Sequence, residues 1–64
     1  MVEQTQRELV HKVNNLIGVI LTQAEVARAA GDLAAARSAL EFITRAAEAT
    51  IPFVRAVQAE QAAD

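Results

Sequence analysis

The chain of 64 residues has no cysteine, tryptophan or tyrosine, and it has only one histidine, one proline and two glycines. Without cysteine the chain forms no disulfide and no thiolate metal site, and with a single histidine a structural zinc site is not expected. A chain this short buries only about 60% of the surface that its unfolded form exposes, so it usually needs a disulfide, a metal or oligomerisation. We therefore expect self-association to stabilise the fold.

Clustered positive charge and a long apolar run are also missing. The net charge is −2, and the six basic residues are scattered along the chain, which argues against a nucleic-acid partner. The longest uncharged stretch, residues 13–24, is too short and too polar to span a bilayer. The first residues lack the basic-then-apolar order of a secretion signal. These features predict a soluble cytoplasmic protein that neither binds nucleic acid nor enters a membrane.

Helix-forming residues dominate, and Gly31-Asp32 is the one clear break. Glycine suits the left-handed position after a helix end, and aspartate caps the start of the next helix. The sequence therefore predicts an all-α fold with helices over residues 2–30 and 33–62, joined by a turn at 31–32 that makes them antiparallel. Pro52 predicts a kink or break near residues 50–51 of the second helix.

Apolar side chains recur at helical spacing in both predicted helices. In the first helix they form the stripe Leu9, Val13, Leu16, Ile20 and Ala24. In the second helix they form the stripe Leu33, Ala36, Leu40, Ile43, Ala47, Ile51 and Val54. Folding at the turn pairs these stripes at positions whose numbers sum to about 63.

More apolar surface remains than one hairpin can cover. A second stripe runs along the second helix, through Ala35, Ala39, Phe42, Ala46, Ala49 and Phe53. Val10, Ile17 and Leu21 lie beside the first helix's stripe. A broad exposed apolar face marks an interface. We expect two hairpins to pair as a homodimeric four-helix bundle, with a higher oligomer or a different partner as the alternatives.

His11 projects about 150° away from the first stripe. Together with Asn15, Gly18 and Thr22 it forms one exposed strip at i, i+4, i+7 and i+11 spacing. A neutral imidazole is a good nucleophile toward phosphorus, and the Asn15 amide one turn later can hold a phosphoryl oxygen or orient a water. Gly18 lets a partner approach closely. The alternative is an ordinary surface histidine without chemistry.

Residues 7–20, with the sequence RELVHKVNNLIGVI, resemble the H-box of the dimerisation and histidine-phosphotransfer domain of two-component sensor histidine kinases. They are most similar to the variant in which two asparagines follow the histidine. The resemblance implies that His11 is the phosphoacceptor and that Asn15 positions the phosphoryl group or a water. We expect the receiver domain of a response regulator to bind around Asn15, Gly18, Val19 and Thr22 and on the first half of the second helix.

Lys12 departs from this family, which usually has an acidic residue there as a general base toward the histidine. An ammonium group cannot take up a proton, so we expect Lys12 to offset phosphoryl charge instead. The chain also has no ATP-binding domain, so we do not expect it to act as a kinase on its own.

These features favour a dimeric histidine-phosphotransfer module of a bacterial two-component phosphorelay. His11 would exchange phosphate with a receiver-domain aspartate, this chain would hold no cofactor, and the receiver would supply any Mg²⁺. One alternative is a dimerisation or protein-interaction module of the same fold that has lost phosphotransfer. The others are an excised fragment of a histidine kinase and a helical adaptor unrelated to signalling.

Overall fold

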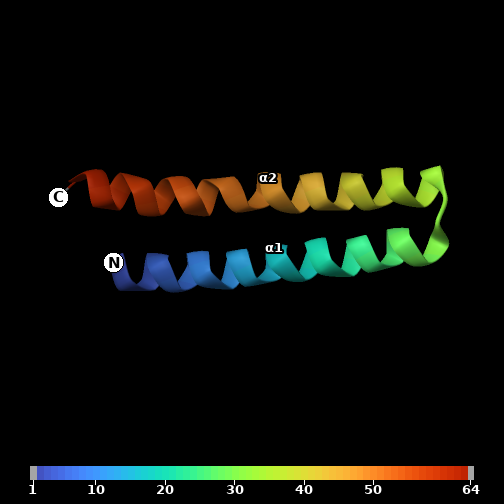
Figure 1. The fold of residues 1–64 in the computed structure, drawn as a ribbon. Coiled ribbons are helices and arrows are strands. Elements are labelled where there is room, and N and C mark those ends of the chain that lie inside the picture. Colours follow the sequence, from blue (N-terminus) through green and yellow to red (C-terminus); the bar gives the residue numbers. More distant parts are fainter. Residues whose placement is uncertain (1, 64) are drawn as a thin grey trace.

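The computed structural model describes residues 2–63, which form an antiparallel two-helix hairpin (Figure 1). Helix α1 spans Val2–Ala30 and helix α2 spans Leu33–Ala63. The helices lie side by side along their whole length, so both ends of the chain are at the same end of the hairpin (Figure 1). The hairpin measures 48 × 14 × 11 Å. The predicted all-α hairpin is therefore confirmed.

The turn is built from local backbone chemistry at two residues. Gly31 has a φ of 68°, a left-handed conformation that glycine adopts without strain, and its N–H donates to the Ala27 carbonyl at 2.9 Å. The Asp32 carboxylate accepts a hydrogen bond from the Ala35 N–H at 2.8 Å and so caps the start of α2. Gly31 therefore ends α1, and the next residue, Asp32, caps the start of α2.

The seam between the helices, meaning the side chains of each helix that face the other, is narrow and contains small residues. No large side chain in the described part of the chain is fully buried. From α1, the half-buried seam residues include Leu9, Val13, Leu16, Val19 and Ala27. From α2, the buried or half-buried seam residues include Ala39, Ile43, Ala46, Thr50, Phe53 and Val57.

The prediction of which α2 residues face α1 is wrong at several positions. Leu33 is 67% exposed, Leu40 63% and Ile51 44%, while Ala39 at 4% and Thr50 at 7% are buried. The seam side of α2 combines small side chains such as Ala39 and Thr50 with Ile43, Phe53 and Val57. Helix α2 is therefore rotated relative to the expected arrangement, and Leu33, Leu40 and Ile51 point outward.

Helix α2 runs through Pro52 without a break. Proline lacks the N–H that would bond to the Glu48 carbonyl four residues earlier, and both residues lie on the exposed surface of α2. Two residues before Pro52, the Thr50 hydroxyl donates to the Ala46 carbonyl at 2.8 Å. This bond satisfies a buried hydroxyl next to the weak point of the helix.

Side-chain contacts across the hairpin pair residues whose numbers sum to 65. The Thr5 hydroxyl donates to Glu60 Oε1 at 2.9 Å, and Lys12 Nζ lies 4.9 Å from the centre of the Phe53 ring. The offset from the expected sum of about 63 has a simple cause, because side chains lean toward the N-terminus of their own helix. In antiparallel helices the side chains of the two helices therefore lean in opposite directions. This raises the sum of the residue numbers of each contacting pair by about two.

Candidate functional site

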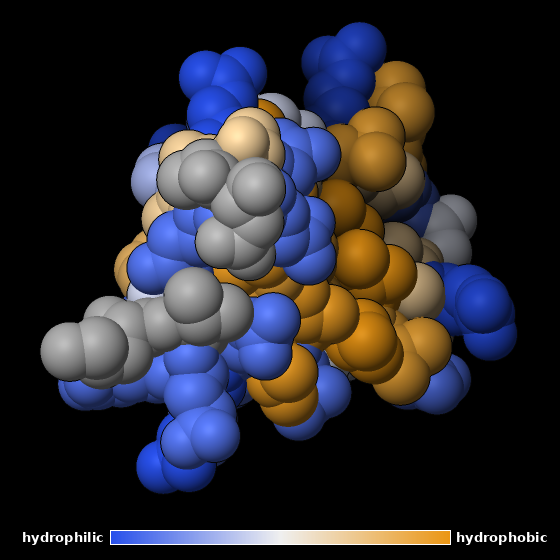
Figure 2. Space-filling model, turned by 90° about the vertical axis from the view of Figure 1, so that its left-hand side faces the viewer, coloured by the Kyte–Doolittle hydropathy of each residue, from blue (hydrophilic) through white to orange (hydrophobic). Residues whose placement is uncertain are grey.

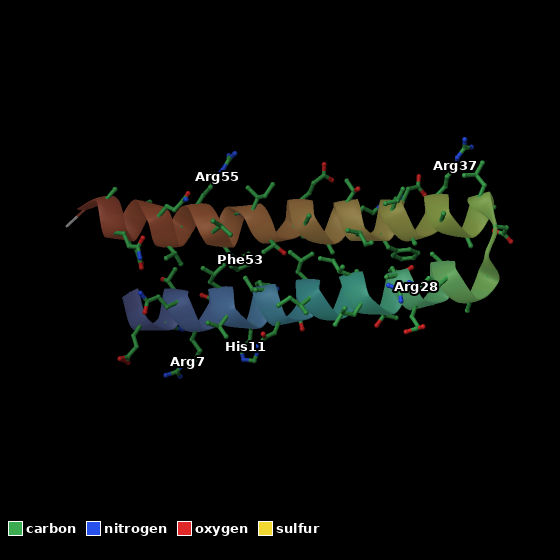
Figure 3. All side chains as sticks on the ribbon, viewed as in Figure 1. Arg7, His11, Arg28, Arg37, Phe53 and Arg55 are labelled. Atoms are coloured by element: carbon green, nitrogen blue, oxygen red, sulfur yellow. The ribbon has the colours of Figure 1, made fainter. Side chains whose placement is uncertain are left out.

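His11 lies on the outer surface of α1. Its side chain is exposed and points away from α2, as does that of Arg7 one turn earlier (Figure 3). The residues around it on this shallow surface all belong to α1: Glu3, Gln4, Arg7 and Glu8. Within residues 2–63 the imidazole makes no hydrogen bond or ion pair. A reacting group could therefore reach its ring nitrogens without disturbing the hairpin.

The side chain of Lys12 projects from α1 in a different direction from that of His11. Its ammonium group lies over the Phe53 ring of α2, 4.9 Å from the ring centre, in a cation–π contact. Phe53 points from α2 toward α1 (Figure 3). The side chain of Lys12 thus bridges the two helices and does not lie beside the imidazole.

Lys12 and Asn15 also line an open groove between the helices. The groove has a volume of about 200 Å³, and its other lining residues are Leu16, Val19, Ala46, Ala49 and Thr50. Apart from the charge of Lys12 and the polar groups of Asn15 and Thr50, this lining is apolar. We call this feature the groove below. It lies on one long side of the hairpin, and the α2 residues that line it all have small side chains.

The structure brings some of the predicted site residues together and separates others. Asn15 and Val19 line the groove, whereas Gly18 and Thr22 are exposed on α1 without lining it. A Cβ added at Gly18 would meet nothing within 4 Å, so packing inside the hairpin does not require a glycine there. His11 lies next to the groove on the same helix.

Sequence reasoning placed partner binding on the first half of α2 but did not assign to this site the individual α2 residues that form it, which are Ala46, Ala49, Thr50 and Phe53. Phe53 and the three small residues follow the spacing of one helix face, which was visible in the sequence. The missing information was the rotation of α2, because that rotation decides which face meets Lys12 and Asn15.

The opposite long side of the hairpin is apolar. Eight large apolar side chains remain exposed there, and by helical position they project to one side: Val10, Ile17, Ile20, Leu21, Leu33, Leu40, Ile51 and Val54. Figure 2 shows hydrophobic residues gathered on one side of the hairpin, over both helices. We call this surface the apolar face. The other two exposed large hydrophobic residues, Val26 and Phe42, belong to the groove side.

The hairpin exposes more surface than a compact protein of its length. Its accessible surface is 4965 Å², about 1,000 Å² more than the roughly 4,000 Å² expected of a compact monomer of 64 residues. A stable protein–protein interface typically takes about 800 Å² from each partner. The excess is therefore the amount that one such interface would cover.

Within residues 2–63, no three His, Asp or Glu side chains gather in a way that could hold a metal ion. In the same part of the chain, neither helix has an apolar stretch long enough to cross a bilayer. Comparisons with protein-family models, with curated proteins and with solved structures found no match to this chain.

Proposed function

We propose that this chain is a dimeric histidine-phosphotransfer module, in which His11 exchanges a phosphoryl group with an aspartate of a receiver domain. The observation that carries the proposal is the position of His11, exposed on the outer side of α1 and without a hydrogen bond or ion pair in the described chain. The resemblance of residues 7–20 to an H-box supports the same role.

The transfer needs only one group of this chain to react. The unprotonated ring nitrogen of His11 attacks the phosphorus of the receiver's aspartyl phosphate, and the bond from phosphorus to the carboxylate oxygen breaks. The aspartate leaves as a carboxylate, and the proton on the other ring nitrogen passes to water. The reverse reaction returns the phosphoryl group. We expect Mg²⁺ to be held by the carboxylates of the receiver.

Asn15 and Gly18 have supporting roles in this proposal. The amide of Asn15, one helical turn after His11, can donate to a phosphoryl oxygen or orient a water. A mid-helix glycine costs about 1 kcal/mol relative to alanine. Because no contact within the hairpin requires it, Gly18 fits a surface that a partner's backbone approaches closely.

Dimerisation through the apolar face forms part of the same proposal. Two hairpins pairing through this face would give each subunit the core that a single hairpin lacks, with the large outward residues of both helices between them. By helical position, His11 projects at the edge of this face and not from its centre. The four-helix bundle therefore leaves the imidazole accessible to a partner.

The test is phosphate transfer from receiver domains. Receiver domains of the source organism are charged with radiolabelled acetyl phosphate and mixed with the chain, and we expect acid-labile, base-stable label on the wild type and none on His11→Gln. Circular dichroism and sedimentation should be the same for both proteins, because His11 is exposed. No label on the wild type with any receiver, or label that persists in His11→Gln, would refute the proposal.

A dimerisation module without phosphotransfer is the second candidate. It is favoured by Lys12, which occupies the position where the H-box has an acidic general base and whose ammonium group lies over Phe53. Under this function the wild type would form the dimer and acquire no label, so the same experiment separates the two.

A further inference from the structure

We propose that Lys12 is a specificity-determining residue for the partner: held by Phe53, its ammonium group pairs with a carboxylate side chain on the surface of the receiver domain that covers the groove. This inference rests on the proposed phosphotransfer function. It differs from the role expected from the sequence, in which Lys12 offsets the charge of the phosphoryl group.

The first reason is the direction of the side chain. Lys12 Nζ lies 4.9 Å from the centre of the Phe53 ring, which belongs to the other helix, whereas His11 points away from that helix (Figure 3). A phosphoryl group on the outward imidazole would thus be on a different side of α1 from the ammonium group. The geometry places the positive charge where a bound partner surface would meet it.

The second reason is the charge of the groove. Lys12 is the only charged residue among the seven that line it, and within residues 2–63 its ammonium group has no carboxylate partner. A surface that filled this groove with apolar groups would remove water from the cation. A carboxylate on that surface would compensate the charge, and a partner with a neutral or basic residue there would leave it unpaired.

The third reason is that Phe53 restricts the lysine. A free lysine side chain samples many rotamers, and fixing it costs up to about 2 kcal/mol of conformational entropy. The cation–π contact already favours one position before the partner arrives. Less entropy is therefore lost on binding, and the charge is presented at a defined point of the groove.

The test measures transfer to His11 from the receiver domain that labels it best, under single-turnover conditions with the receiver in excess. We expect Lys12→Gln to raise the half-saturating receiver concentration about fivefold, as for a surface ion pair of modest strength, with the maximal transfer rate unchanged. Lys12→Arg should stay close to wild type. The wild-type value should rise with salt more steeply than that of Lys12→Gln.

Arg55→Gln is the matched control, because it also removes one positive charge. Arg55 lies on α2 and points away from α1 (Figure 3), so we expect it to leave the half-saturating concentration unchanged. Phe53→Leu should raise that concentration in the wild type but add little in the Lys12→Gln background, because the ring acts through the lysine.

Three results would overturn this inference while leaving the proposed function intact. The first is a half-saturating concentration that does not change in Lys12→Gln. The second is a loss confined to the maximal rate, which would place Lys12 on the phosphoryl group instead. The third is a Lys12→Arg protein that behaves like Lys12→Gln. Absence of label on the wild type would instead refute the phosphotransfer function itself.

Discussion

Replacing Leu40 by alanine tests the role of the apolar face most directly. Leu40 is 63% exposed in the hairpin, so pairing with a second copy would bury roughly that share of a side chain whose full burial gives about 2.5 kcal/mol. Each subunit would then lose about 1.5 kcal/mol and the dimer about 3 kcal/mol. Because each 1.4 kcal/mol corresponds to a tenfold change, we expect the dimer Kd to rise about 100-fold.

The helix itself should tolerate this change. Alanine has a helix propensity at least as high as leucine, so circular dichroism at concentrations that keep both proteins dimeric should be the same. Sedimentation equilibrium over a range of protein concentrations measures the Kd. The wild-type free energy of unfolding should also increase with protein concentration, because only the folded chain can pair.

Phe42→Ala is the control for this substitution. Phe42 lies on the same helix and is 55% exposed, but it belongs to the groove side of the hairpin. We therefore expect it to leave the dimer Kd within a few-fold of wild type. An unchanged Kd in Leu40→Ala, or an equal loss in Phe42→Ala, would refute the assignment of the apolar face as the dimer interface.

Two further substitutions test the local structure of α2 by urea unfolding at fixed protein concentration. Asp32→Ala removes the cap on the Ala35 N–H and should lower the free energy of unfolding by about 1 kcal/mol. Asp32→Asn should retain most of it, and equal losses in the two would contradict the cap. Pro52→Ala restores a backbone donor at an exposed mid-helix position and should raise this free energy by up to about 3 kcal/mol. A lower value would mean that the proline itself stabilises the native helix.

The groove and the apolar face lie on opposite long sides of the hairpin, which has a consequence for function. Partner binding at the groove and pairing through the apolar face need not compete for the same side chains. Three of the five predictions above therefore separate into two groups. Changes at His11 and Lys12 should affect phosphate transfer without affecting the dimer, and Leu40→Ala should affect the dimer first.

The sequence by itself determined the parts of this protein that depend on local chemistry. Glycine adopts the left-handed conformation that ends α1, and the Asp32 side chain caps α2, so the turn and the hairpin could be predicted from neighbouring residues. The exposed position of His11 follows from helical spacing in the same way, because the apolar residues around it define the opposite side of α1.

Only the tertiary structure decided how α2 is rotated against α1. Two apolar stripes compete for the seam, and the choice between them depends on which side chains fit between two helices in close contact, which is a property of both helices together. Ala39 and Thr50 face inward, and Leu33 and Leu40 face outward. The same rotation places Phe53 under Lys12, residues far apart in the sequence. Helical periodicity cannot predict such a contact, because it describes each helix alone.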